Sequence, residues 1–140
     1  KLPKSILITS ASPEEGKTVT ASNLAITIAQ SEYSVLLLDA DLRKPMLHKI
    51  FNLDNSKGLS TYLAGTSDLN IIQEGPLPMM SIIPSGPIPP NPSELLSSNK
   101  TQKLLELLKK RYDIIILDSP PLIGVSDSLI LSKFTSGTLI

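Results

Sequence analysis

Apolar residues gather in four short runs along the chain, and polar or loop-forming residues follow each run. The runs cover residues 5–9, 34–39, 79–83 and 113–118. Most are apolar at nearly every position, which is typical of parallel strands buried on both faces of a sheet. We therefore predict four strands, and a further strand that begins at residues 138–140.

Between these runs the apolar residues recur with a helical period. We predict helices over residues 17–30, 45–51, 58–65 and 101–111, with further helical starts at 91–94 and 126–131. The 101–111 segment has basic residues in its last turn, and its one-sided apolar positions are Leu104, Leu105, Leu107 and Leu108. Residues 84–90 include four prolines, so we predict a surface loop there.

This alternation of strands and helices predicts an α/β fold, with a mostly parallel sheet that carries helices on both faces. A length of 140 residues suits one domain, 1–140. The chain starts without Met and ends inside an apolar run, so we expect a piece of a longer protein, truncated at both ends.

Composition excludes several classes of protein. Thirteen basic and thirteen acidic residues are scattered, so we expect no nucleic-acid partner. The absence of cysteine excludes disulfides and thiolate metal sites. The longest apolar runs fall far below the roughly 20 residues that cross a bilayer, and no signal-peptide pattern opens the chain.

Candidate chemistry begins with residues 11–18, Ala-Ser-Pro-Glu-Glu-Gly-Lys-Thr, between the first predicted strand and helix. They match the phosphate-binding pattern G-x-x-x-x-G-K-[ST] everywhere except at Ala11. An ordinary strand-to-helix turn is disfavoured, because a lysine in the first helical turn opposes the helix dipole unless an anion compensates it. We predict a P-loop NTPase fold whose nucleotide contacts come from Ser12, Pro13, Glu14, Glu15, Gly16, Lys17 and Thr18.

Acidic residues follow two of the other predicted strands: Asp39 and Asp41 after one, Asp118 after the other. Ligands of open parallel sheets bind beyond the carboxyl ends of the strands, and Mg²⁺ takes carboxylate and hydroxyl oxygens. We therefore predict a magnesium site from Thr18, Asp39, Asp41 and Asp118, in which one carboxylate of the Asp39/Asp41 pair accepts a proton from an attacking hydroxyl.

Structural roles compete with these interpretations. A strand-terminal aspartate can cap a helix or form an Asx turn, and Asp41 could instead pair with Arg43 or Lys44 at the surface. Arg43 and Lys44 could steer a phosphate or an acidic segment of a partner, or lie on an ordinary solvated face.

Five strings together resemble the bacterial protein-tyrosine kinases, which are relatives of the deviant P-loop ATPases of the Min and Par type. The strings are ASPEEGKTVTASNLA, LLLDADLRKP, GLSTYLAG, IIPSGPIPPNPSELLSS and YDIIILDSPP. Within them, DADLRKP and SGPIPPNPSELL are similar to the kinase branch. No second lysine stands at positions 11–15, whereas the Min/Par branch typically has one near the start of its P-loop.

The resemblance implies roles for single residues. Lys17 would contact the β- and γ-phosphates of ATP, and Thr18 and Asp118 would ligate Mg²⁺. Asp39 and Asp41 would supply the proton-accepting and metal-shell carboxylates.

The resemblance also implies partners and a place in the cell. The family transfers the γ-phosphoryl group of ATP to tyrosines, chiefly in a tyrosine-rich C-terminal tail of a neighbouring subunit in a homo-oligomeric ring. A membrane polysaccharide co-polymerase adaptor, fused or separate, controls it, so the kinase would be cytoplasmic, at the inner face of the membrane, and regulate capsule or exopolysaccharide export.

Some family features are absent: Ala11 replaces a glycine, and neither the E-x-x-R-x-x-R oligomerisation motif nor a C-terminal tyrosine cluster occurs. Two alternatives remain open. One is a Min/Par-type ATPase switch that controls dimerisation and attachment, and the other is a regulatory module that binds ATP and transfers nothing.

Overall fold

The structure is a computed structural model that describes residues 5–8, 14–119 and 137–139. Its elements, in chain order, are β1 (Ser5–Ile8), α1 (Glu14–Gln30), β2 (Val35–Asp39), α2 (Leu47–Ile50), α3 (Leu59–Leu63), the 3₁₀ helix η1 (Leu69–Ile71), β3 (Gln73–Glu74), β4 (Met80–Ile83), α4 (Pro92–Leu96), α5 (Asn99–Lys109), β5 (Ile114–Asp118) and β6 (Gly137–Leu139). Within the described ranges, none of the helices combines the length and apolarity that a bilayer-spanning helix requires. The predicted helix at 126–131 lies outside these ranges.

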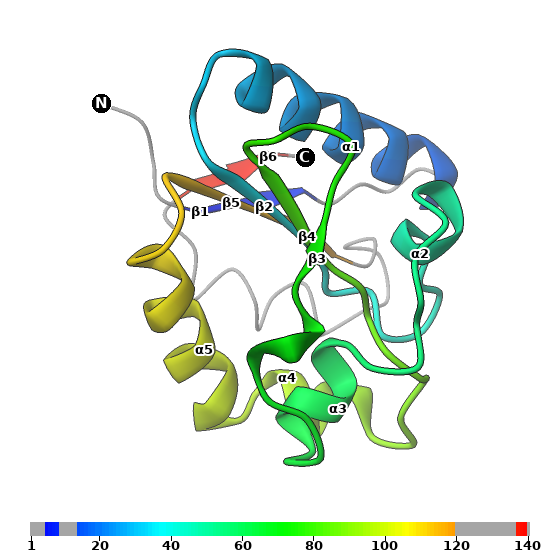
Figure 1. Ribbon diagram of the computed structural model, residues 1–140. Coiled ribbons are helices and arrows are strands. Elements are labelled where there is room, and N and C mark those ends of the chain that lie inside the picture. Colours follow the sequence, from blue (N-terminus) through cyan, green and yellow to red (C-terminus); the bar gives the residue numbers. More distant parts are fainter. Residues whose placement is uncertain (1–4, 9–13, 120–136, 140) are drawn as a thin grey trace.

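The described strands form one sheet in the order β3-β4-β2-β5-β1-β6. All neighbours are parallel except β3 and β4, which are antiparallel. The chain crosses from β1 to β2 through α1, and β5 later fills the position between these two strands (Figure 1). Three strands that are distant in the sequence therefore lie side by side at the centre of the sheet.

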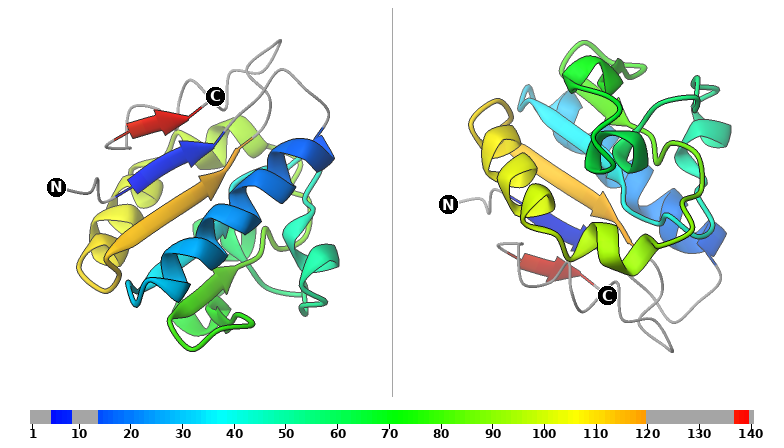
Figure 2. Two further views of the ribbon diagram at one scale, coloured as in Figure 1. Left: turned by 90° about the horizontal axis from the view of Figure 1, so that it is seen from above. Right: turned by 90° about the horizontal axis from the view of Figure 1, so that it is seen from below.

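Each face of the sheet has its own core, because successive strand residues point to opposite faces. On one face, Val35 and Leu37 of β2 pack with Leu47 of α2 and with three alanines of α1: Ala21, Ala25 and Ala29. On the other face, Leu36 and Leu38 pack with buried residues of α3, α4 and α5. Figure 2 shows these helices on both sides of the strands, so the predicted three-layer α/β fold is confirmed.

Alanine spacing explains how α1 packs. Ala21, Ala25 and Ala29 follow one another at four-residue intervals and are buried against the sheet. Val19, two residues before Ala21, is 50% exposed although it is apolar. Leu107 of α5 is likewise 40% exposed, so only the other three leucines of the predicted stripe face the core.

The proline-rich segment 84–90 is only partly a surface loop. Pro84, Ser85 and Gly86 are buried, whereas Pro87 and Ile88 are exposed. The prediction of a surface loop was therefore wrong for its first half, because α3 packs onto that half. Sequence patterns also gave no sign of η1 or of the two-residue strand β3.

The side chains of Asn55 and Ser60 hold this segment in place through hydrogen bonds. The side chain of Asn55 donates to the carbonyl oxygen of Gly86 at 3.1 Å and accepts from its N–H at 2.8 Å. The hydroxyl of Ser60 donates to the carbonyl oxygen of Pro87 at 2.6 Å. Gly58 lies so close that an added Cβ would stand 2.3 Å from the backbone nitrogen of Gly86. The segment after β4 is thus fixed on the start of α3.

Candidate functional site

The carboxyl ends of β1, β5 and β2 meet at one edge of the sheet. Asp118, the last residue of β5, stands in register with Ile8 of β1 on one side and with Asp39 of β2 on the other. The segment that contains the phosphate-binding pattern follows β1 directly. The topology thus brings together the three sequence regions that predicted a nucleotide site, and β5 lies between the other two.

A hydrogen bond joins α1 to this edge. The Thr18 hydroxyl donates to Oδ2 of Asp118 at 2.9 Å, and both side chains are buried. Thr18 is the last residue of the phosphate-binding pattern and lies in the first turns of α1, which begins at Glu14. The contact joins positions 100 residues apart in the sequence, so the fold brings together two of the residues predicted to ligate Mg²⁺.

Asp39 is fully buried beside Asp118. Its Oδ2 accepts hydrogen bonds from the N–H groups of Met46 and Leu47, each at 3.1 Å, and its Oδ1 accepts from the N–H of Asp41. Burial and the neighbouring charge of Asp118 raise the pKa of Asp39 to about 7, although the three backbone donors act in the opposite direction. Asp39 therefore changes charge close to neutral pH.

Asp41 lies two residues beyond the end of β2 and is also buried. Its Oδ1 accepts from the N–H groups of Arg43 at 3.3 Å and Lys44 at 3.0 Å. This is the Asx turn that sequence analysis had left open as an alternative. The turn fixes the carboxylate beside Asp39, so the structural role and a chemical one are compatible.

The donor set of this edge fits a magnesium ion. Thr18, Asp39, Asp41 and Asp118 offer hydroxyl and carboxylate oxygens, which are the hard ligands that Mg²⁺ prefers. Among the residues that the structure describes, no three acidic or histidine side chains lie close enough to hold a metal by themselves. That agrees with Mg²⁺ chemistry, in which one or two carboxylates are completed by water and phosphate oxygens.

The phosphate-binding loop is described only in part. Ser12 and Pro13 lie outside the described residues, and Glu14, Glu15 and Lys17 are described only as backbone of α1. At Gly16 a Cβ would meet nothing within 4 Å, so the start of the helix borders open space. A helix N-terminus that faces open space next to buried carboxylates suits a phosphate group and its metal ion.

The backbone donors of Met46 and Leu47 were missed by sequence analysis. A helix was expected from Pro45, and α2 in fact begins at Leu47. The first N–H groups of a helix have no partner inside it, and here they bind Asp39. The proline was the one sequence signal for a nearby helix start, and it did not indicate which carboxylate would accept.

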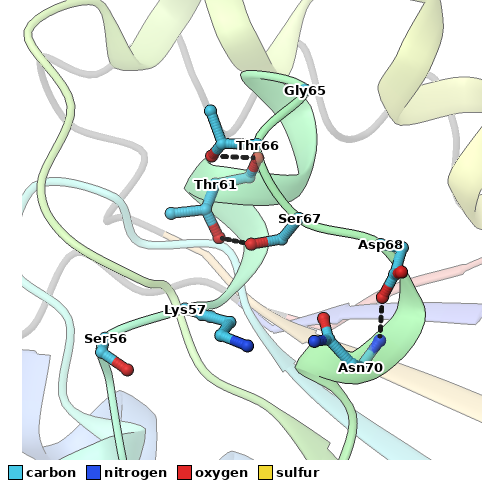
Figure 3. Close-up of a pocket in the computed structure, with 8 residues that line it drawn as sticks. All are labelled: Ser56, Lys57, Thr61, Gly65, Thr66, Ser67, Asp68 and Asn70. Atoms are coloured by element: carbon cyan, nitrogen blue, oxygen red, sulfur yellow. Dashed lines mark hydrogen bonds between the residues drawn. The ribbon is translucent and has the colours of Figure 1, made fainter.

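A separate polar hollow of about 490 Å³ lies between α3 and η1, lined by Ser56, Lys57, Thr61, Gly65, Thr66, Ser67, Asp68 and Asn70 (Figure 3). Its hydroxyls bond to the protein itself. The Ser67 hydroxyl donates to Oγ1 of Thr61 at 2.9 Å, and the Thr66 hydroxyl donates to the carbonyl oxygen of Thr61 at 3.1 Å. We call this hollow the polar cleft. None of its lining residues belongs to the edge of the sheet that carries Asp39, Asp41 and Asp118, which we call the carboxylate edge.

Known proteins resemble this chain along nearly its whole length. The family described as AAA domain matches residues 4–138. The tyrosine-protein kinase YwqD of Bacillus subtilis is 44% identical over 138 residues, which cover 98% of this chain and 58% of YwqD. The tyrosine-protein kinase etk of Escherichia coli is 43% identical over 136 residues, which cover 96% of this chain but only 19% of etk. The chain thus spans a fifth to three fifths of these relatives.

Solved structures of similar proteins point to the same family. The chimerical protein CapA2B2 has a TM-score of 0.94 at 42% identity, over 99% of this chain and 62% of that one. The kinase domain of Escherichia coli tyrosine kinase ETK has a TM-score of 0.92 at 42% identity, over 96% of this chain and 53% of that one. MinD of Pyrococcus horikoshii, at 23% identity and a TM-score of 0.80 over 96% of this chain and 56% of that one, shares the fold.

These matches confirm the resemblance drawn from the sequence strings. Both of these relatives are named tyrosine-protein kinases, and the Min-type protein matches at the level of the fold. The chain belongs to the AAA domain family and is similar, within it, to the kinase domains of bacterial tyrosine-protein kinases.

Proposed function

We propose that residues 1–140 form the ATP-binding core of a protein-tyrosine kinase that transfers the γ-phosphoryl group of ATP to tyrosine. The observation that carries this proposal is the hydrogen bond between Thr18, directly behind Gly-Lys, and Asp118, at the end of the central strand β5. The names of the relatives support tyrosine phosphorylation, and MinD of Pyrococcus horikoshii, which was solved with Mg-ADP, supports the use of a nucleotide with Mg²⁺.

In this proposal the start of α1 holds the phosphates of ATP, with Lys17 at the β- and γ-phosphates and residues 12–16 around them. Thr18, Asp41 and Asp118 would hold Mg²⁺ together with water and phosphate oxygens. A Mg²⁺ ion held there would neutralise the charge that develops on the phosphate oxygens. The protein supplies position and charge, which are most of what phosphoryl transfer requires.

Asp39 is the better proton acceptor of the pair. A base works best when its pKa lies near the working pH, and the pKa of Asp39 is about 7. The tyrosine oxygen forms a bond to the γ-phosphorus, the bond from that phosphorus to the bridging oxygen of ADP breaks, and the tyrosine proton passes to the Asp39 carboxylate. Asp41 and Asp118 then serve the metal shell.

The proposal extends to partners. By similarity to the tyrosine kinases, the intact protein would assemble as a homo-oligomeric ring and modify a tyrosine-rich tail of a neighbouring subunit. A membrane polysaccharide co-polymerase adaptor would hold it at the inner face of the membrane and link it to capsule or exopolysaccharide export.

A phosphotyrosine assay tests the core of this proposal. We expect the intact protein to become phosphorylated on tyrosine with ATP and Mg²⁺, and we expect Lys17→Met to abolish the signal while circular dichroism stays unchanged. ATP hydrolysis without phosphotyrosine would favour the Min/Par-type switch instead. Tight ATP binding with neither reaction would favour a regulatory module.

A further inference from the structure

A groove of about 460 Å³ adjoins the carboxylate edge. We call it the basic groove, and its lining residues are Arg43, Lys44, Pro45, Met46, His48, Lys49, Asn55 and Ile88. Its volume lies within the roughly 300–1,000 Å³ of typical ligand sites. It is distinct from the nucleotide site, because none of its lining residues belongs to the phosphate-binding pattern.

One wall of the groove is tied to the candidate catalytic carboxylates. The N–H of Met46 donates to Asp39 at 3.1 Å, and the N–H of Lys44 donates to Asp41 at 3.0 Å. Any group that occupies the groove therefore lies next to the residues that hold these carboxylates. No other hollow described above has such a link to the site.

The opposite wall is fixed as well. Ile88 lies two residues beyond Gly86, whose backbone pairs with the side chain of Asn55 through two hydrogen bonds. Arg43 reaches across to α4, where its Nη2 donates to the Ser93 hydroxyl at 3.1 Å. Both walls are thus ordered by interactions within the protein, which reduces the conformational entropy that the protein loses when a ligand binds.

The lining combines positive charge with apolar surface. Arg43, Lys44 and Lys49 are exposed cations, and none of the described residues that line the groove is acidic. Ile88 exposes 63% of its surface, more than any other large apolar residue that the structure describes, and it gives the groove an accessible apolar side chain. Burial, and then the charge of Lys49, lower the pKa of His48, so its imidazole is neutral around pH 7.

We propose that the basic groove docks the protein segment that accepts the phosphoryl group, and that it selects tyrosines flanked by aspartate or glutamate. The proposal rests on the proposed kinase function. Acidic side chains complement the three cations, and the aromatic ring complements the apolar lining. A folded pocket with an apolar wall favours a peptide over a flat anionic membrane surface. The acceptor hydroxyl would then stand beside Asp39.

Direct binding tests the groove without requiring catalysis. A fluorescent peptide with a tyrosine between glutamates should bind the intact protein at least about tenfold more tightly than the same peptide with lysines, and salt should weaken it. Lys49→Glu should weaken the acidic peptide about tenfold and leave ATP affinity unchanged. The matched control is Lys103→Glu, an equal charge change on the opposite side of the molecule, on α5 (Figure 1). It should change neither affinity.

A second variant guards against misfolding. Ile88→Glu alters an exposed side chain, so the fold should persist while the acidic peptide binds more weakly. Equal affinity for acidic and basic peptides, or equal effects of Lys49→Glu and Lys103→Glu, would overturn the proposal. Tighter, Lys49-dependent binding to phosphatidylserine vesicles than to the peptide would overturn it in favour of a membrane surface.

The kinase assay separates the two proposals. If transfer occurs, Lys49→Glu should raise KM for the acidic peptide about tenfold with little change in kcat. Transfer to tyrosine that ignores flanking charge and Lys49 would leave the kinase function standing and reject the groove. Lys49-dependent peptide binding without any transfer would reject the kinase function and, with it, the role of the groove in docking an acceptor, and would leave the groove as a peptide-binding site only.

Discussion

The carboxylate edge and the polar cleft both contain several polar side chains, but these side chains are hydrogen-bonded at the surface in one region and buried in the core in the other. In the polar cleft, the hydroxyls of Thr61, Thr66 and Ser67 bond to the protein itself at the surface. At the carboxylate edge, Asp39 and Asp118 are placed side by side in the core, where burial and mutual repulsion raise the pKa of Asp39.

The difference shows why the volume of a hollow is a poor guide to function. Satisfied hydroxyls at a surface cost little and offer little to a ligand. Two neighbouring buried carboxylates cost stability, and a cation between them removes that cost. A fold that keeps such a pair at the end of a central strand next to a helix N-terminus indicates a site for a cation and phosphate.

Substituting Asp118 should give the largest effect. Asp118→Asn keeps the size of the side chain and removes its charge, so phosphotyrosine formation in the intact protein should fall by about 100-fold or more. The folded state should persist, because repulsion with Asp39 is relieved. Glu106→Gln on α5 is the matched control, since its carboxylate only meets Lys109 at the surface, at 3.7 Å. Equal activity of both variants would remove Asp118 from the site.

Adding a side chain at Gly58, where α3 meets the proline-rich segment, should destabilise the fold near the polar cleft. In Gly58→Ala the new methyl group would stand 2.3 Å from backbone atoms of Gly86 and Pro84, so the free energy of unfolding should fall by about 3 kcal/mol or more in urea titrations. Gly16→Ala makes the same change where nothing lies within 4 Å, and it should leave stability equal or raise it by up to about 1 kcal/mol. A similar loss in both variants would contradict the close approach at Gly58.

The buried pair of Asp39 and Asp118 should make the stability of the metal-free protein depend on pH in an unusual way. Because the pKa of Asp39 rises from 3.8 to about 7 on folding, its contribution is fully present below pH 4 and is lost as the pH rises toward 7. Urea titrations without Mg²⁺ should therefore show a stability component of a few kcal/mol that declines between pH 4 and pH 7. In Asp39→Asn this component should vanish, and Mg²⁺ should restore stability near pH 7 in the unsubstituted protein only. A decline of the same size in both proteins would rule out Asp39 as its source.

The polar cleft should respond weakly. Thr61→Val removes a hydroxyl that donates to the carbonyl of Gly58 and accepts from its N–H, so unfolding should become easier by about 1 kcal/mol. Transfer and ATP affinity should not change. Thr27→Val is the control, because the Thr27 hydroxyl bonds only within the exposed face of α1. A loss of ATP binding in Thr61→Val would mean that the polar cleft belongs to the functional site.

Local patterns were sufficient for most of the secondary structure. The continuous apolar runs marked β1, β2, β4 and β5, because a strand buried on both faces tolerates few polar residues. Local patterns failed where a tertiary partner decides the outcome. The strand β3 exists only by pairing with β4, and Leu107 is exposed while Leu104, Leu105 and Leu108 fill the core.

The sequence by itself determined which chemical groups the candidate site offers, a Gly-Lys-Thr sequence and aspartates at strand ends, because phosphate and Mg²⁺ prefer these residue types. Only the tertiary structure decided that β5 lies between β1 and β2, which puts Asp118 beside both Thr18 and Asp39. Strand order and the basic groove depend on long-range packing, and no local pattern encodes which strands become neighbours.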